Sequence, residues 1–512
     1  MTKGIDKELY KMAKKIQIMD TTLRDGEQTI GVAFTVEEKL TIAKSLLMEA
    51  KVDAVEVASA RVSEGEFEAV KEICKWAKSK NMLDKIEVLG FVDKEKSVDW
   101  IDNAGCKVMN LLCKASLNHV TNQLKKKPED HIKDINDTIQ YARKGGIIVN
   151  IYLEDVSNGL LDSKEYVLFL LNNIRGIERV MIADTLGIWS PEQTSQFCKL
   201  LVEKYNYRFD FHGHNDYGLA VANTLAAINA GVSRIHTTVN GLGERTGNCA
   251  LANVVAAVND HTDFMISVAE NKLNSLSRLV ESISGIRVLP NTPIVGENVY
   301  TQCCGVHADG DKKGNLYFNK IMPERFGGQR IYALGKTSGK ASIEKNLEVL
   351  GIELDDDAKK KVLQRVVEIG DKKGTVTLSD LPYIVSDVLG ESVKHSVKLV
   401  DFSLKLGSRE KPSANIKLEI KGKIYEESSI GDGQYDAFMG AVKKIYSRLG
   451  KTLPRLVDYS VRIPPGGKTD ALVETVITWQ NGGTFKTKGI DSDQTTAAIK
   501  ATLNMLNRNG FP

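Results

Sequence analysis

Two histidines one residue apart, His212 and His214, are the side chains whose type and spacing point most directly to chemistry. On a β-strand, residues i and i+2 face the same side, so both imidazoles would point in one direction. Two imidazoles and one carboxylate can hold a divalent cation and leave positions open for a substrate. Asp25 can supply the carboxylate and Asn248 a neutral fourth ligand, and Mg²⁺, Mn²⁺ and Zn²⁺ all accept such donors. Histidines packed in a core are the alternative interpretation of a single H-x-H pattern.

Three further polar features lie close to these residues or follow other strand-like runs. Arg24 directly precedes Asp25, and its permanently charged, fork-shaped guanidinium suits a carboxylate or a developing alkoxide. An ordinary Arg–Asp salt bridge is the alternative. Glu154 ends a strand-like run and can orient a substrate or remove a proton. The segment NGLGERTGN at 240–248 lies between a strand and a helix, where backbone N–H groups can meet an anion.

A unit that recurs from residue 15 to about residue 260 must position these side chains: a short β-branched run, a turn and an amphipathic helical stretch. The strand candidates are residues 15–22, 54–59, 85–92, 106–113, 148–156, 178–185, 208–215 and 234–241. Near-continuous apolar strands separated by helices predict a parallel sheet buried on both faces. Eight units favour a TIM (β/α)₈ barrel over an open doubly wound sheet, and polar residues gather at the strands' carboxyl ends, where this barrel carries catalytic groups. Turn chemistry alone is the alternative source of that polarity.

The strand–helix repeat does not continue in the rest of the chain. We expect the barrel to occupy residues 1–285 and a linker with a helical subdomain to occupy 286–392. The polar stretch GVHADGDKKGNLY carries His307 and Tyr317, which can reach the barrel mouth only if this segment folds over it. From 393 to 512, alternating strands run in two halves, each ending in a Gly/Asp-rich turn before a helix. This repeat predicts a separate C-terminal α+β domain.

Composition excludes several classes of partner. A formal net charge of +3 over 512 residues gives no reason to expect nucleic acid or an anionic membrane surface. No apolar stretch is long enough to span a bilayer, and the N-terminus is polar. Seven cysteines without C-x-x-C spacing indicate reduced thiols. The sequence therefore predicts a cytoplasmic protein.

Several motifs together resemble one enzyme family. LRDGEQ at 23–28, with Lys39 at its spacing, and FDFHGHNDYGLAVA at 209–222 are similar to the two signatures of the isopropylmalate, homocitrate and citramalate synthases. The segment 240–248 resembles the family's glycine-rich loop, and GVHADG resembles a subdomain motif that bears a catalytic histidine. The C-terminal repeat resembles the allosteric domain of the leucine-pathway synthases. The resemblance covers nearly the whole chain, and a homodimer is the family expectation.

The resemblance implies a Claisen-type condensation of acetyl-CoA with a 2-oxoacid. A divalent ion on Asp25, His212 and His214 would chelate the oxoacid and polarise its ketone. Arg24 would then lie where the alkoxide charge develops. Thr185 resembles the family's substrate-carboxylate hydroxyl. The acid–base candidates are Glu154, His307 and Tyr317, and the residues do not decide which of them removes the methyl proton.

The identity of the oxoacid depends on pocket volume. Leu89, Leu112 and Tyr152 resemble the family's side-chain pocket, and isopropylmalate synthases generally carry a small residue where Tyr152 falls. A tyrosine and two leucines leave room for a methyl group only, which implies pyruvate as substrate and (R)-citramalate as product, toward isoleucine. Ordinary barrel core is the alternative role of these three residues. The alternative enzyme is a 2-isopropylmalate synthase that uses 2-oxoisovalerate in leucine biosynthesis.

The C-terminal domain is expected to bind a branched-chain amino acid as feedback effector. Isoleucine fits a citramalate synthase, and leucine fits the alternative enzyme. The candidate pocket residues are Tyr435, Leu456, Tyr459, Ile463, Val473 and Gln494. The hydrophobic core of a small α+β domain would explain the same residues.

Two other functions compete with a synthase. A related lyase would cleave a hydroxyacyl-CoA with the same metal and arginine, but such lyases generally lack the C-terminal repeat. A catalytically inactive amino-acid sensor belongs to a different class. The intact set of Arg24, Asp25, Glu154, His212 and His214 argues against it.

Overall fold

The computed structural model describes the chain in segments and divides it into two compact units. The described residues are 14–302, 316, 319–328, 330–350, 352–371, 376, 380–389, 396–407, 410–462, 473–481 and 484–507. The first unit comprises Met1–Thr301 with Phe318–Ile331, and the second comprises Gln302–Tyr317 with Tyr332–Pro512. His307, Tyr317 and Ile463 lie outside the described residues.

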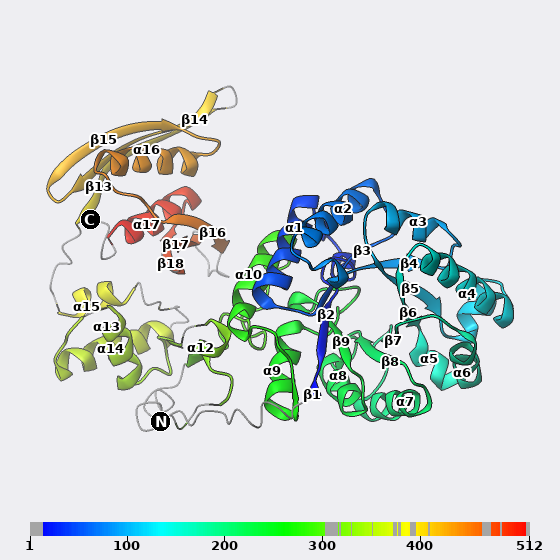
Figure 1. Ribbon diagram of the computed structural model, residues 1–512. Helices are drawn as coiled ribbons and strands as arrows, with labels where there is room; N and C mark the ends of the chain where they lie inside the picture. The colour runs from blue at the N-terminus through cyan, green and yellow to red at the C-terminus, as the bar shows by residue number, and fades with distance from the viewer. Residues whose placement is uncertain are drawn as a thin grey trace. The chain divides into compact units, whose positions relative to one another are not determined.

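The first unit is a closed barrel of eight parallel strands that follow one another in chain order (Figure 1). The strands are β2 (Gln17–Asp20), β3 (Ala54–Ser59), β4 (Ile86–Phe91), β5 (Val108–Lys114), β6 (Ile148–Glu154), β7 (Arg179–Asp184), β8 (Arg208–Gly213) and β9 (Arg234–Thr237). Closure comes from β2, which pairs with β3 at Met19↔Ala54 and with β9 at Gln17↔Arg234. The predicted TIM barrel is therefore confirmed.

Helices surround this barrel, and Figure 1 shows them as an outer ring. They are α1 (Val36–Lys44), α2 (Glu64–Ser79), α3 (Lys96–Asn103), α4 (Pro128–Lys144), α5 (Val156–Asp162), α6 (Lys164–Asn173), α7 (Pro191–Lys204), α8 (Ala220–Asn229), α9 (Leu251–His261) and α10 (Leu273–Ser284). Local sequence explains where several begin. A capping box between Thr35 and Glu38 starts α1, and Ser190 with Gln193 starts α7 in the same way.

Apolar side chains fill the space between strands and helices because parallel strands are buried on both faces. All of β7 is buried, and its outward residues join one large core that runs around the barrel. A smaller cluster fills the barrel interior, and its members are Met19, Ala54, Leu89, Tyr152, Met181 and Ala183, with Leu112 packed against them. Short elements complete the unit: β1 (Lys14–Lys15), β10 (Phe264–Met265) and α12 (Pro323–Phe326).

The second unit contains three helices and a repeated α+β arrangement. The helices α13 (Lys340–Leu350), α14 (Asp356–Asp371) and α15 (Leu381–Leu389) enclose their own apolar cluster. The repeat consists of two antiparallel three-stranded sheets, each followed by a helix. Its elements are β13 (Val397–Gly407), β14 (Glu410–Ile420), β15 (Lys423–Ile430), α16 (Gln434–Arg448), β16 (Arg455–Arg462), β17 (Val473–Gln480), β18 (Thr484–Asp491) and α17 (Gln494–Leu506). The expected C-terminal repeat is present, and its core lies between the sheets and their helices. Across the described residues, we find no helix that is both long and apolar enough to cross a membrane.

Candidate active site

Asp25, His212 and His214 meet at the carboxyl ends of β2 and β8, and all three are buried. Their donor atoms could hold a metal ion, so we call these three residues the metal-site group. The Nε2 atoms of the two histidines lie 3.3 Å apart. Asp25 Oδ2 lies 3.1 Å from His212 Nε2 and 3.7 Å from His214 Nε2. Three donor atoms from two strand ends therefore converge on one point, because barrel closure brings β2 within two strands of β8.

The chemistry of this donor set fits a divalent cation. Asp25 Oδ1, His214 Nδ1 and Asn248 Oδ1 are buried and have no hydrogen-bond partner among the described residues. Burial lowers the pKa of His214 to about 4, so its ring is neutral and able to ligate at neutral pH. Burial opposes ionisation of Asp25, but the adjacent Arg24 charge holds the pKa of this carboxyl below its usual value. A buried oxygen left without partners is otherwise unfavourable, and a cation beside Asp25 and Asn248 would satisfy such an oxygen, whereas His214 Nδ1 is not on the side of the ring that faces His212.

The backbone and a buried lysine hold Asp25 in place. The N–H groups of Arg24, Asp25 and Gly26 all donate to the carbonyl oxygen of Thr21, which folds the segment after β2 into a tight turn. Lys39 on α1 is fully buried, and its Nζ donates to Leu23 O at 2.9 Å. The same Nζ pairs with two carboxylates, on Glu27 at 2.7 Å and on Glu66 at 2.5 Å. The lysine of the sequence signature therefore anchors the metal-site turn to the helices behind it.

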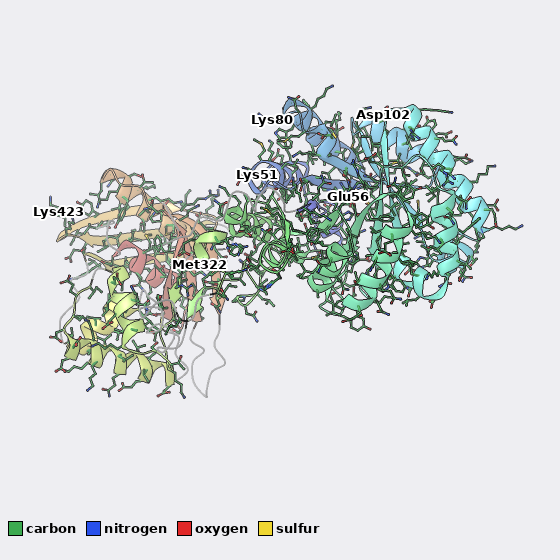
Figure 2. The ribbon with its side chains drawn as sticks, turned by 60° about the horizontal axis from the view of Figure 1, so that its bottom comes forward. Lys51, Glu56, Lys80, Asp102, Met322 and Lys423 are labelled. Carbon is green, nitrogen blue, oxygen red and sulfur yellow. The ribbon has the colours of Figure 1, made fainter. Side chains whose placement is uncertain are left out.

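Arg24 is held by a carboxylate that the sequence analysis did not single out. Its Nε donates to Glu56 Oε2 at 2.7 Å, and its NH1 lies 3.5 Å from Asp25 Oδ2. Glu56 is buried on β3 inside the barrel (Figure 2), where Thr21 donates to it at 2.7 Å and Asn110 at 2.8 Å. Glu56 is the one charged residue in the apolar run AVEVAS, and this position could have indicated a buried carboxylate with a partner. Since Glu56 fixes one edge of the guanidinium, the arginine keeps one orientation beside the metal-site carboxylate.

The three expected pocket residues lie together in the barrel interior. Leu89 and Tyr152 belong to the interior cluster, and Leu112 packs against it. The Tyr152 ring centroid lies 5.5 Å from the Arg24 guanidinium carbon and 5.7 Å from the His212 ring. The cluster therefore borders the metal-site group, and a substrate held there would meet these side chains.

Other rim residues form a polar layer at the ends of β5, β6 and β7. Glu154 Oε2 pairs with Lys114 Nζ at 2.5 Å. The hydroxyl of Thr185 accepts a hydrogen bond from Asp155 N at 2.9 Å, and its carbonyl accepts one from Arg245 at 2.8 Å. Glu154 and Thr185 thus both lie at the barrel's C-terminal rim.

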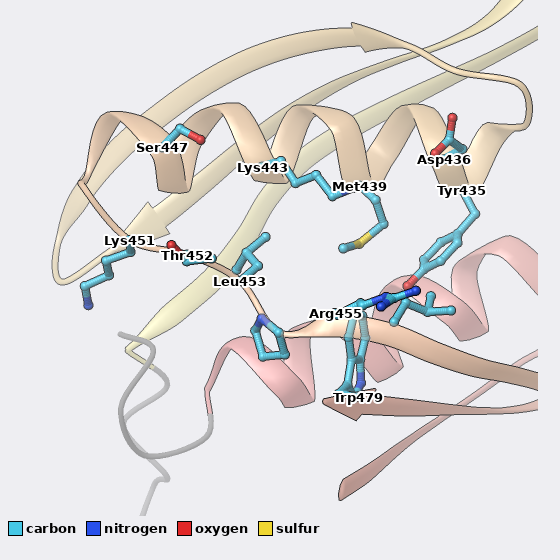
Figure 3. A pocket seen from close by; sticks show the side chains of 12 residues that line it. Tyr435, Asp436, Met439, Lys443, Ser447, Lys451, Thr452, Leu453, Arg455 and Trp479 are labelled. Atoms are coloured by element: carbon cyan, nitrogen blue, oxygen red, sulfur yellow. The ribbon is translucent and has the colours of Figure 1, made fainter. Parts of the chain in front are cut away.

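The C-terminal repeat contains a cavity of about 630 Å³ between α16 and β16 (Figure 3). Tyr435 and Leu456 line it, and the Tyr459 ring lies 5.5 Å from the Tyr435 ring. Val473 and Gln494 are not among its lining residues. The cavity wall combines apolar groups with cationic ones: Met439, Leu453, Trp479, Lys443, Lys451 and Arg455.

Comparison with known proteins adds three family matches that together span most of the chain. Residues 15–280 match the family described as HMGL-like. Residues 294–374 match a homocitrate synthase post-HMGL domain-like family, and residues 375–509 match the LeuA allosteric (dimerisation) domain. The order of the matches follows the barrel, the helical segment and the C-terminal repeat.

Curated relatives match over almost their whole length. A probable 2-isopropylmalate synthase of Methanopyrus kandleri is 35% identical, covering 97% of this chain and 99% of its own. An (R)-citramalate synthase of Methanocaldococcus jannaschii is 34% identical, covering 96% of this chain and 99% of its own. A 2-isopropylmalate synthase of the same organism is 35% identical, with 96% and 94% covered. Overall identity does not distinguish the two activities, because relatives with both names match equally well.

Proposed function

Because this chain belongs to the family of 2-isopropylmalate and (R)-citramalate synthases, we propose that it is an acyltransferase that condenses acetyl-CoA with pyruvate to give (R)-citramalate and CoA. The observation that carries the choice of pyruvate is the interior cluster. Leu89, Leu112 and Tyr152 pack together beside the metal-site group, and Leu89 and Tyr152 are almost fully buried. The methyl group of pyruvate would displace these side chains less than the isopropyl group of 2-oxoisovalerate. The second candidate, 2-oxoisovalerate condensation in leucine biosynthesis, is kept because relatives with that name match equally well.

Each residue of the site is proposed to have one role in the condensation. A divalent ion held by Asp25, His212 and His214, with Asn248 beside them, would supply Lewis acidity toward the ketone of the oxoacid. Arg24 directs its remaining N–H groups at the oxygen on which charge develops as the methyl carbon attacks the ketone carbon. The Thr185 hydroxyl is assigned to the oxoacid carboxylate. Hydrolysis of the thioester by water then releases CoA.

Glu154 is our proposed acid–base group among the described residues. Its carboxylate lies at the end of β6 and is partly exposed, so it can meet a thioester that enters from the rim. The Lys114 ammonium lies 2.5 Å from Glu154 Oε2 and fixes the position of the carboxylate at the rim. His307 and Tyr317 keep their proposed acid–base roles by family resemblance.

The C-terminal repeat is proposed to dimerise the enzyme and to regulate it. Its matched family is described as an allosteric dimerisation domain. We assign the feedback effector, isoleucine for a citramalate synthase, to the cavity lined by Tyr435 and Leu456. Tyr459, Val473 and Gln494 do not line this cavity, and they stay sequence predictions, as does Ile463, which lies outside the described residues. The apolar wall suits a branched side chain, and Arg455 suits its carboxylate.

Turnover of an oxoacid panel tests the substrate assignment. With acetyl-CoA and a divalent metal, kcat/KM for pyruvate should exceed that for 2-oxobutyrate about tenfold, because each extra methylene in a filled pocket is worth ~1–3 kcal/mol. The value for 2-oxoisovalerate should be lower again. Free CoA release measures all three reactions. Faster use of 2-oxoisovalerate than of pyruvate would refute the citramalate assignment and support the second candidate.

Effector inhibition tests the cavity. Isoleucine should inhibit pyruvate condensation more strongly than leucine, and Leu456→Asp should remove the inhibition while leaving the uninhibited kcat unchanged. Val457→Asp is the matched control, because Val457 is the next residue of β16, is exposed and does not line the cavity. The measurement is CoA release over a series of amino-acid concentrations. Equal inhibition by both amino acids, or by neither, would contradict the isoleucine assignment.

A further inference from the structure

A buried polar network lies beneath the oxoacid pocket and ends on the hydroxyl of Tyr152. The Tyr152 oxygen lies 3.0 Å from Nδ1 of His236, a fully buried residue on β9. The other ring nitrogen of His236, Nε2, lies 3.3 Å from Asp210 Oδ2. The tyrosine ring therefore faces the pocket, and its polar end is bound inside the barrel.

The protein surrounding Asp210 decides which His236 nitrogen carries the proton. Asp210 accepts hydrogen bonds from Arg179 at 2.7 Å and from Arg234 at 2.6 Å. Two cationic guanidinium groups thus donate to this buried carboxylate, which acts as their acceptor. An ionised carboxylate only accepts hydrogen bonds, so His236 must donate from Nε2. A neutral imidazole carries one proton, so Nδ1, which lies 3.0 Å from the Tyr152 oxygen, is the acceptor.

The direction of the Tyr152 hydrogen bond follows from this tautomer. The phenol has one proton and can donate it to one acceptor at a time. It is donated to His236 Nδ1 at 3.0 Å rather than to Glu56 Oε2, which lies farther away at 3.4 Å. Glu56 Oε2 already accepts from Thr21 and Arg24, both at 2.7 Å. The hydroxyl therefore donates to His236.

Ring contacts restrain the tyrosine in the same orientation. Its ring meets the His236 ring edge-on with centroids 5.4 Å apart, and it meets the His212 ring edge-on at 5.7 Å. A rotation that enlarged the pocket would break the hydrogen bond and both contacts together. A buried acceptor left without its donor is costly, so the tyrosine resists displacement by a larger substrate.

We propose that His236 is a positioning residue that sets discrimination by oxoacid size, because it holds the Tyr152 ring in the pocket. The inference rests on the proposed function, since it concerns the oxoacid that the same pocket accepts. His236 does not reach the substrate itself. It acts through the hydroxyl of Tyr152, and its own position is fixed by Asp210 and the two arginines beneath it.

The test compares substrate ratios in variants at the two positions. His236→Leu removes the acceptor and should raise kcat/KM for 2-oxobutyrate relative to pyruvate about tenfold, the discrimination typical of one methylene. His236→Asn places an amide oxygen near the position of Nδ1 and should keep the wild-type ratio. Tyr152→Phe loses the same hydrogen bond and should shift the ratio as His236→Leu does. The double variant should shift it no further, because both single changes remove one interaction.

Three outcomes would overturn the inference. An equal loss of kcat/KM for both oxoacids in His236→Leu would indicate a purely structural role. A ratio that stays at the wild-type value in Tyr152→Phe would show that the hydroxyl does not matter, and this variant keeps the ring even if His236→Leu does not fold. Additive shifts in the double variant would show that the residues act independently. Failure of the proposed function would look different: the wild-type enzyme would prefer 2-oxoisovalerate, whatever the variants do.

Discussion

Replacing His212 with alanine should abolish binding of the divalent ion and lower kcat/KM for condensation on the order of a thousandfold, because Lewis-acid polarisation is worth several kcal/mol. The neutral amide of Asn248 beside the site does not replace an imidazole as a ligand. Asp25 Oδ2 and His214 Nε2 would remain 3.7 Å apart, with one imidazole and one carboxylate where three groups now converge. Metal content measured by elemental analysis gives a readout that does not depend on turnover. Circular dichroism and the melting temperature show whether the variant folds.

His261→Ala is the matched control for this experiment. His261 is an exposed histidine in the last turn of α9, outside the metal-site group, so the variant should keep both metal and activity. Chelation of the wild-type enzyme should reproduce the His212→Ala result, and return of one metal at a time identifies the preferred ion. A wild-type protein that releases no CoA with any oxoacid, with or without metal, would favour the amino-acid sensor. Full activity of His212→Ala would refute the metal assignment.

The barrel could be predicted because its physical cause is local. A parallel strand that is buried on both faces must be apolar along its length, and eight such runs separated by helices leave few other folds. Residues 54–59 were expected as a strand, and β3 spans Ala54–Ser59. Strand ends are less accurate: the expected strand is 15–22, whereas β2 spans Gln17–Asp20, because the chain turns after Asp20 and Thr21 O accepts the N–H groups of that turn.

The convergence of the metal-site group followed from two geometric rules. Strand alternation places His212 and His214 on one side, and barrel closure brings β2 close to β8. Both rules need only the element order, which the sequence pattern supplies. Arg24 is a candidate because of its residue type beside Asp25, whereas Tyr152 is one through family resemblance. The structure places them 5.5 Å apart, measured from guanidinium carbon to ring centroid.

The buried network could not be predicted because its partners are distant in the sequence. Glu56 meets Arg24 across 32 residues, and His236 meets Tyr152 across 84. One charged residue in an apolar strand signals that a partner exists, but it does not identify the partner. The lining of the C-terminal cavity could be predicted only in part for the same reason. Its lining brings Met439 of α16 together with Trp479 of β17, and sequence alone does not say that these two distant positions face one cavity.

Arg24→Lys should lower kcat/KM about a hundredfold while leaving metal content unchanged, because loss of one oriented donor at a developing oxyanion typically costs ~2.7–4 kcal/mol. Lysine keeps the positive charge but not the planar fork that can donate to Glu56 and to the substrate oxygen at once. Most of the loss should fall on kcat, since the alkoxide charge exists in the transition state and not in the bound ketone. Steady-state kinetics with pyruvate measure the division between kcat and KM.

Glu56→Gln removes the negative charge beside Arg24 but keeps an oxygen that can orient its guanidinium. The amide keeps an oxygen for the Arg24 Nε–H, so the guanidinium stays in place, and the loss in kcat should be smaller than in Arg24→Lys. Arg208→Lys is the control, because Arg208 lies at the start of β8, at the opposite end of the barrel, and pairs with Glu178 on the exposed side. If Arg24→Lys kept wild-type kcat, the alkoxide would have to be stabilised by the metal alone. If it lost metal together with activity, Arg24 would act through Asp25 instead of through the substrate.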